Sequence, residues 1–125
     1  MLKKLLPLAV VTMLLTGCNA TFTNLTPKQQ VRNEEGLYPV EVSMNTRNGT
    51  LRWDSIKGTI LVGANQYPMQ RTMLMSNRWE GSVPVPANTN IVHYRYRLDF
   101  LYNDFGGPKP DSALSPQYRL LILDE

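Results

Sequence analysis

The sequence predicts an all-β sandwich, and three observations support that prediction. Residues 91–103 alternate apolar and polar side chains with a period of two, as a strand with one buried face requires. Several shorter alternating segments lie on both sides of this segment, and Asn, Gly and Pro residues separate them. No segment shows the 3.6-residue period of a long amphipathic helix. Two sheets that bury their apolar faces against each other account for all three observations.

The alternation within residues 91–103 is the most extended in the chain. Its apolar positions are Val92, Tyr94, Tyr96, Leu98, Phe100 and Tyr102. Its polar positions are His93, Arg95, Arg97 and Asp99. A strand places the two sets on opposite faces, so we expect the first set in the core and the second set at the surface.

The remaining strands are predicted from shorter segments of the same kind. They are residues 37–45, 50–53, 56–63, 67–75, 79–85 and 117–123. The sequence Asn48-Gly49 provides turn chemistry after the first of them, and Pro84 and Pro86 favour an edge position. About six to seven short strands with regularly spaced turns are typical of an immunoglobulin-like β-sandwich, which we place at residues 37–125.

Two segments are expected to have other roles. Residues 104–116 are rich in Gly and Pro and lack periodicity, which predicts a long loop of the kind that often carries function. Met69, Met73 and Met75 share one parity within residues 67–75. We expect these flexible apolar side chains to fill the core.

The N-terminal residues have the layout of a secretory signal. Lys3 and Lys4 precede a short apolar stretch that ends in Leu15-Thr16-Gly17-Cys18. The stretch is well short of the roughly 20 residues that a membrane span requires. The sequence Leu15-Thr16-Gly17-Cys18 resembles the lipobox of bacterial lipoproteins. This resemblance implies a signal peptide at residues 1–17, lipidation of Cys18, and, because Asn19 is not Asp, a place in the outer membrane.

Residues 18–36 are mostly polar and contain little that a core would take up. We therefore expect a flexible tether between the lipid and the folded domain. A short helical turn is an alternative for residues 27–33, since Thr26 suits its cap and Pro27 its first position.

Composition argues against several functions. The formal charge is +3, and without Lys3 and Lys4 it falls to +1, which argues against nucleic acid as a partner. The chain has one His and one Cys, so it offers neither a Cys–His pair nor a zinc site with several imidazoles. Asp99, Asp104 and Asp111 do not have the spacing of an EF-hand loop. We expect no enzyme activity, no cofactor and no metal site.

Two groups of residues are candidates for binding. Trp53, Tyr67 and Trp79 would suit a platform on which a sugar ring stacks, although Trp79 has the parity of a core residue and Trp53 fits either role. The second group is the polar row His93, Arg95, Arg97 and Asp99. A row with charges of both signs is either a solvated sheet face or a surface on which a protein partner docks.

A second resemblance covers residues 56–103. The sequences Trp79-Glu80-Gly81, Val83-Pro84-Val85-Pro86 and Tyr94-Arg95-Tyr96-Arg97-Leu98-Asp99 are similar to the pattern of immunoglobulin-like early-set domains, which include the glycogen-binding modules of starch enzymes. The resemblance implies a sandwich and raises carbohydrate binding. Those modules turn at a Gly soon after the Asp, whereas here Phe100-Leu101-Tyr102 continues the strand.

These observations lead to one expectation and one alternative. We expect a non-enzymatic, lipid-anchored envelope protein that serves as an adaptor or accessory subunit for another envelope protein. The alternative is a surface carbohydrate-binding module that uses exposed aromatic side chains. A small hydrolase built on the carboxylates is disfavoured, because the sequence offers no paired nucleophile and base.

Overall fold

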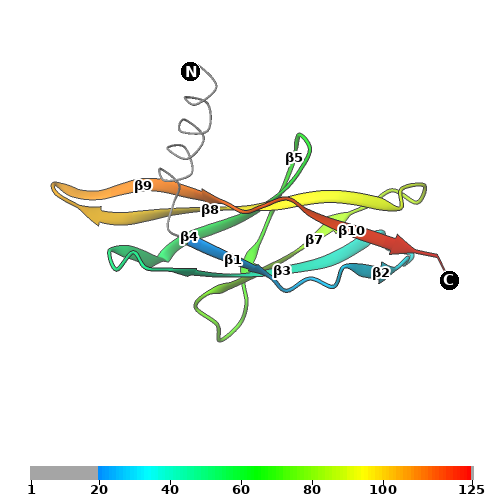
Figure 1. Ribbon diagram of the computed structural model, residues 1–125, viewed down its shortest axis with the longest axis horizontal. Helices are drawn as coiled ribbons and strands as arrows, with labels where there is room; N and C mark the ends of the chain where they lie inside the picture. The colour runs from blue at the N-terminus through cyan, green and yellow to red at the C-terminus, as the bar shows by residue number, and fades with distance from the viewer. Residues whose placement is uncertain (1–19, 125) are drawn as a thin grey trace, which may run out of the picture.

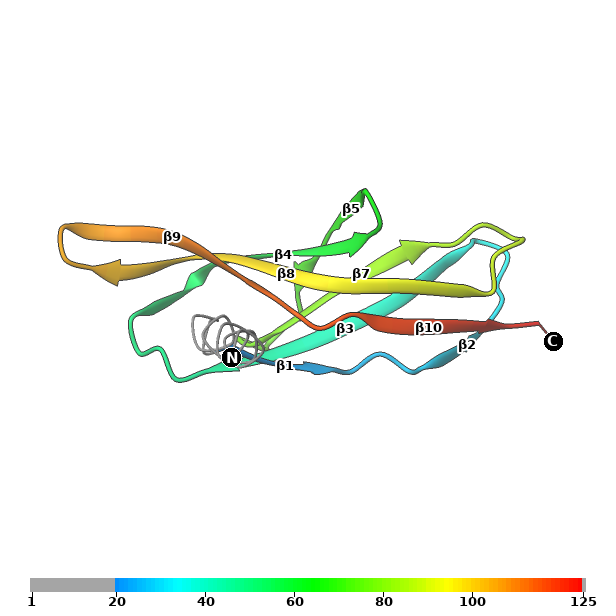
Figure 2. The same ribbon diagram turned by 45° about the horizontal axis from the view of Figure 1, so that its top comes forward.

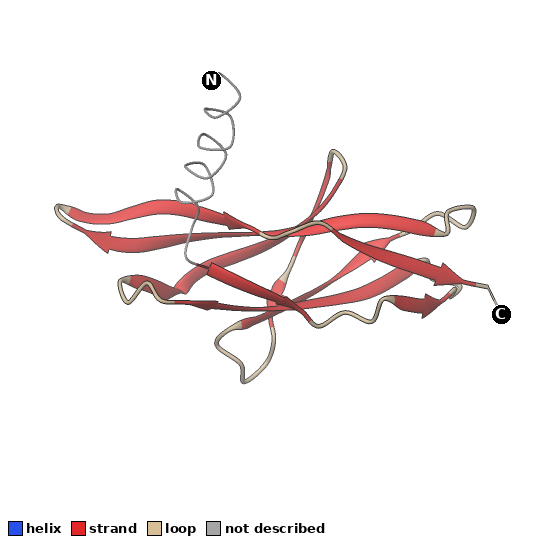
Figure 3. Cartoon of the chain, in the orientation of Figure 1, coloured by secondary structure: helices blue, strands red, loops and turns tan. Residues whose placement is uncertain are grey.

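The structure is a computed structural model that describes residues 20–124, which form ten strands and contain no helix (Figure 3). The predicted all-β sandwich is confirmed. The strands are β1 (Ala20–Asn24), β2 (Gln29–Val31), β3 (Leu37–Thr46), β4 (Leu51–Val62), β5 (Asn65–Pro68), β6 (Gln70–Arg71), β7 (Arg78–Pro84), β8 (Ile91–Asp104), β9 (Gly107–Leu114) and β10 (Tyr118–Leu123). The predicted signal peptide, the lipobox and Cys18 lie outside the described residues.

The strands form two sheets packed face to face (Figure 1). The first sheet has the order β1-β3-β7-β6, and the second has the order β2-β10-β8-β4-β5. Strand β9 also pairs with β8, so β9 and β10 follow one another along the same edge of that strand. The order is that of an immunoglobulin-like sandwich, in which two mainly antiparallel sheets pack face to face.

Strand β8 is the centre of the second sheet, and it buries one face, as its alternation predicted. Val92, Tyr94, Tyr96, Leu98 and Phe100 are buried, and Tyr102 is partly buried. They face buried side chains of the first sheet, among them Tyr38, Val40, Val42, Trp79 and Val83. Among residues 20–124 there is no helical segment with the length and apolar character of a membrane span.

The expected tether at residues 18–36 is wrong for the part that the structure describes. Ala20 pairs with Thr46 and Asn24 with Val42, so β1 is an edge strand of the first sheet. Strand β2 pairs in parallel with β10 in the second sheet, which also excludes the alternative of a helical turn. An edge strand needs only one apolar face, and Phe22 supplies it by packing against the core. The folded domain therefore includes residues 20–36.

The expected loop at residues 104–116 is wrong as well. Strand β9 pairs with β8 over its whole length, and the two form a hairpin that reaches beyond the rest of the sandwich (Figure 2). Phe105 and Gly106 make the turn, and Gly106 and Gly107 have φ angles of 88° and 123° that disfavour other residues. Pro108 and Pro110 are tolerated because β9 is an outer strand and has a free edge.

Residues 67–75 do not form one strand. Strands β5 and β6 are short, and a loop at residues 72–77 follows them. Only Met69 packs against the core as expected. Met73 is 84% exposed and Met75 is 38% exposed, so the prediction that they fill the core is wrong.

Candidate functional site

The three aromatic residues proposed as a sugar platform are not brought together. Trp79 is 1% exposed and lies between the sheets, which corrects its assignment to a ligand site. The Arg71 guanidinium lies over the Trp79 ring, 5.1 Å from its centroid, so a cation packs against the buried indole.

Trp53 and Tyr67 are both partly buried but lie far apart on the second sheet. Tyr67 pairs with Ile60, seven positions along β4 from Trp53. At about 3.3 Å per residue this separation exceeds the width of a single sugar ring several times. A stacking site that uses both rings for one sugar is therefore excluded by the geometry.

Tyr67 and His93 instead share a groove, which we call the end groove. It has a volume of about 620 Å³, and its apolar lining includes Val62, Pro84, Pro86 and Ile91. Glu35, Asn65 and His93 supply polar groups to the same lining. The groove lies at the end of the sandwich where β5, β7 and β8 meet, and it joins one residue from each predicted binding group.

The polar row of β8 stands on the outer face of the second sheet, as predicted. Cross-strand pairing sets His93 beside Arg119 of β10 and Asp99 beside Lys57 of β4. Lys57, Arg95, Arg97 and Arg119 therefore occupy one sheet face with a single carboxylate, Asp99, among them; we call this set of five the basic face. Asp99 pairs with Arg97 at 3.2 Å, and the side chains of Lys57, Arg95 and Arg119 are exposed.

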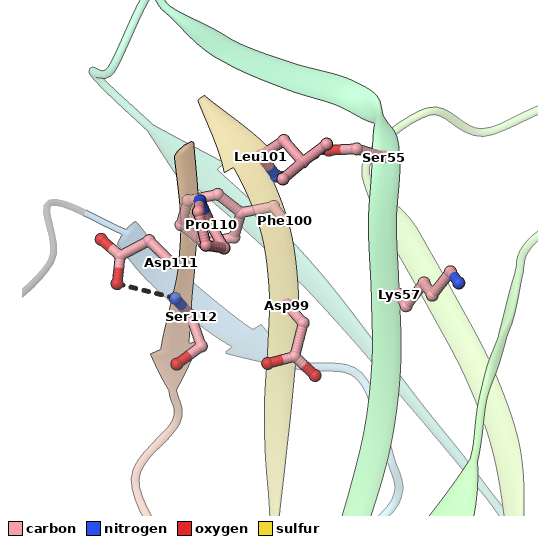
Figure 4. Close-up of a pocket in the computed structure, with 8 residues that line it drawn as sticks. All are labelled: Ser55, Lys57, Asp99, Phe100, Leu101, Pro110, Asp111 and Ser112. Carbon is pink, nitrogen blue, oxygen red and sulfur yellow. Dashed lines mark hydrogen bonds between the residues drawn. The ribbon is translucent and has the colours of Figure 1, made fainter. Parts of the chain in front are cut away.

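A shallow hollow of about 500 Å³ lies at one end of the basic face (Figure 4). Its polar groups include Lys57 of β4, Asp99 of β8, and Asp111 and Ser112 of β9, and the Lys57 side chain points away from Asp99. The Ser55 hydroxyl is already engaged, because it accepts a hydrogen bond from the Leu101 backbone N–H at 2.8 Å. The hollow is lined by the carboxylates of Asp99 and Asp111 and by Ser112, which suits polar contacts with a partner.

The described residues contain no group of three or more His, Cys, Asp or Glu side chains placed to hold a metal ion. Asp111 lies near Asp99 in the hollow, but its side chain accepts a hydrogen bond from the Ser112 backbone N–H at 2.8 Å.

A polar cluster inside the sandwich was not predicted. The Tyr96 hydroxyl contacts Asn24, Thr26 and the Glu41 backbone oxygen, while the Asn24 amide donates to the Tyr94 hydroxyl. Burial raises the pKa of Tyr96 far above that of a free tyrosine, and burial also raises the pKa of Tyr118. The signal was present in the sequence, since a Tyr on the buried face of a strand needs a partner for its hydroxyl.

Comparison with known proteins adds little to this geometry. No protein-family model matches the chain, and no curated protein matches it. One solved structure with a similar arrangement is an endo-β-1,4-mannanase from Thermotoga petrophila, with 12% sequence identity and a TM-score of 0.47. The similarity covers 85% of this chain and 20% of the mannanase chain. A likeness at this level assigns no activity to this protein.

Proposed function

We propose that the protein is a non-enzymatic, lipid-anchored envelope protein, attached through Cys18, and that it binds an acidic surface of another envelope protein. The observation that carries the proposal is the basic face. Three neighbouring strands, β4, β8 and β10, present four cationic side chains beside one carboxylate.

The charge on this face differs from that of the chain as a whole. Residues 18–125 contain eleven Lys and Arg against ten Asp and Glu, which is close to neutrality. The basic face concentrates an excess of positive charge on a flat sheet. Such a surface attracts an acidic partner and fixes its orientation, and Arg is enriched where proteins meet.

The position of the domain relative to its anchor supports the same function. Ala20 is already paired in a strand, two residues after Cys18. A lipid on Cys18 would therefore hold the domain close to the membrane, with little freedom to move away from it. An adaptor that keeps a partner near the membrane benefits from such a short connection.

The test is photo-crosslinking in the cell from the intact lipoprotein. Leu114 is the best position for the crosslinking residue, because it pairs with Arg97 on the same face, is 53% exposed and leaves every charge in place. Ser82, an exposed position in the first sheet, is the matched control. We expect one dominant envelope protein to be captured from position 114 and not from position 82.

Charge reversal completes the test. Arg95→Glu should remove the crosslink from position 114 while leaving the amount of folded protein unchanged, since Arg95 is exposed. The proposal would be rejected if positions 114 and 82 captured the same abundant envelope proteins and Arg95→Glu did not change the crosslinks.

The end groove favours carbohydrate as a second candidate. A partly buried Tyr67 beside Asn65 and His93 combines an aromatic surface with hydrogen-bonding groups, as sugar sites do. A glycan array probed with the protein tests this. Binding that Tyr67→Ala abolishes and Phe105→Ala preserves would support the groove, because Phe105 is an aromatic side chain outside it. If the folded protein bound no glycan on the array, carbohydrate binding would be rejected as a function of the end groove.

A further inference from the structure

The loop between β6 and β7 exposes three consecutive large apolar side chains. Met73 is 84% exposed, Leu74 is 98% exposed and Met75 is 38% exposed. Residues 72–77, which we call the apolar loop, contain no charged side chain. The loop at the opposite end of β7, residues 86–90, is polar and contains no large apolar side chain. Exposed apolar side chains gathered on one loop mark a contact with a partner or a membrane.

The apolar loop is held in a defined shape. The Thr72 N–H donates to the Arg78 oxygen at 2.9 Å, and the Met75 N–H donates to the Thr72 oxygen at 3.1 Å. Arg71, at its base, donates to the Ser76 oxygen at 2.6 Å. Leu74 has a φ angle of 66°, a left-handed conformation that is strained for a residue with a side chain. The fold thus presents these side chains outward instead of letting them collapse onto the core.

The loop lies next to the point where the chain leaves toward Cys18. Strand β3 runs between β1 and β7 in the first sheet. Ala20 of β1 pairs with Thr46, and the Asn77 oxygen accepts a hydrogen bond from the Met44 N–H at 3.0 Å. The start of β1 and Asn77, at the base of the apolar loop, therefore flank the same end of β3, across which β1 and β7 lie about 10 Å apart at the usual strand spacing. Figure 1 shows the loop extending from the lower edge of the sandwich.

Chain length then limits the distance to the lipid. Cys18 precedes Ala20 by two residues, which span about 7 Å at most when fully extended. A lipid on Cys18 would consequently bring the membrane surface within reach of the apolar loop.

We propose that the apolar loop is a second membrane contact, which inserts Met73 and Leu74 into the headgroup and acyl boundary of the leaflet that holds the lipid of Cys18. The inference rests on the lipidation of Cys18 proposed above. The lack of charge suits this occupant, since a charged side chain at that depth would oppose insertion. Arg71 does not oppose it, because its guanidinium is bonded to the backbone of Trp53 and Ser76.

The experiment uses the full-length protein reconstituted into vesicles of phosphatidylethanolamine and phosphatidylglycerol. The variant Met73→Cys receives an environment-sensitive fluorophore, and Asn88→Cys, in the polar loop at the other end of β7, is the matched control. Cys18 is the only other Cys, and a thioether-linked lipid removes its thiol from the labelling reaction. We expect blue-shifted emission at position 73 and quenching by spin labels on the lipid acyl chains, with neither effect at position 88.

The intact mass of the protein separates the two ways in which the idea can fail. A mass without lipid on Cys18 would overturn both the anchored function and this inference. A lipidated protein whose label at position 73 behaves like the label at position 88 would overturn the inference alone. A label that stays aqueous in vesicles but is shielded in the native envelope would also overturn it, and would assign the loop to a protein partner.

Discussion

The side-chain oxygen of Asn24 accepts a hydrogen bond from the Tyr96 hydroxyl at 2.7 Å, which ties the first strand to the central strand. The same Asn24 donates its amide to the Tyr94 hydroxyl at 2.9 Å, and Thr26 lies 3.0 Å from the Tyr96 hydroxyl. The polar ends of two core tyrosines are thus satisfied by residues that precede β2. The N-terminal segment is part of the interior of the sandwich and contributes to its stability.

Replacement of Asn24 should therefore destabilise the fold. Asn24→Ala removes the partner of the Tyr94 hydroxyl and one of the partners of the Tyr96 hydroxyl, and we expect a loss of about 1–3 kcal/mol in the free energy of unfolding. Thr23→Ala, in the same strand but exposed, should change it by less than about 0.5 kcal/mol. Urea unfolding followed by fluorescence measures both. Equal stability of the two variants would show that the hydrogen bonds to Asn24 contribute nothing.

Removal of the whole N-terminal segment should have a larger effect. A shortened protein that begins at Leu37 loses β1, β2 and the packing of Phe22 against the core. Lost apolar burial and unpaired hydroxyls together predict a cost of at least about 3 kcal/mol. The matched control begins at Ala20 and keeps every described strand. Thermal unfolding compares the two, and identical melting temperatures would contradict the assignment of these residues to the domain.

Stability should fall at alkaline pH because of Tyr96. Its pKa is raised by burial in the folded state, so the folded protein retains a proton that the unfolded chain loses above about pH 10. The contribution to stability is complete below that pH and decreases as the pH rises, by about 1.4 kcal/mol per pH unit for each such group. Tyr118, whose pKa is also raised, acts in the same direction.

The measurement is urea unfolding between pH 8 and about pH 11, where free tyrosine ionises. Tyr96→Phe should flatten the alkaline decline, although it lowers stability at neutral pH by removing the hydroxyl that bonds to Asn24 and Thr26. A decline of the same slope in the variant would show that other groups cause it.

The two tryptophans should differ in their access to solvent. Trp79 is buried between the sheets and Trp53 is only partly buried. In the variant Trp53→Phe, the remaining fluorescence should be weakly quenched by acrylamide, whereas in Trp79→Phe it should be quenched more strongly. Strong quenching of Trp79 would show that its indole is accessible to solvent, and Trp79 would again be a candidate for a sugar-stacking site.

The burial pattern within a strand could be predicted from the sequence, whereas the apolar loop could not. The period-two alternation of residues 91–103 sufficed for strand β8, because side-chain direction in a strand follows from backbone geometry alone. The parity of Trp79 indicated its burial for the same reason. The apolar loop was missed because Met73 and Met75 have the parity of a strand, and only the hydrogen bonds of the loop reveal that the chain turns there.

The amino-acid sequence by itself determined the fold class, the buried face of strand β8 and the outward row from His93 to Asp99, since each follows from local alternation. The tertiary structure decided which distant segments meet. It joined residues 20–31 to both sheets, placed Lys57 and Arg119 beside that row, and set the apolar loop beside the start of β1. Pairing between strands far apart in the chain depends on the packing of the whole core. The sequence of one strand therefore does not indicate which other strands lie beside it in the sheet.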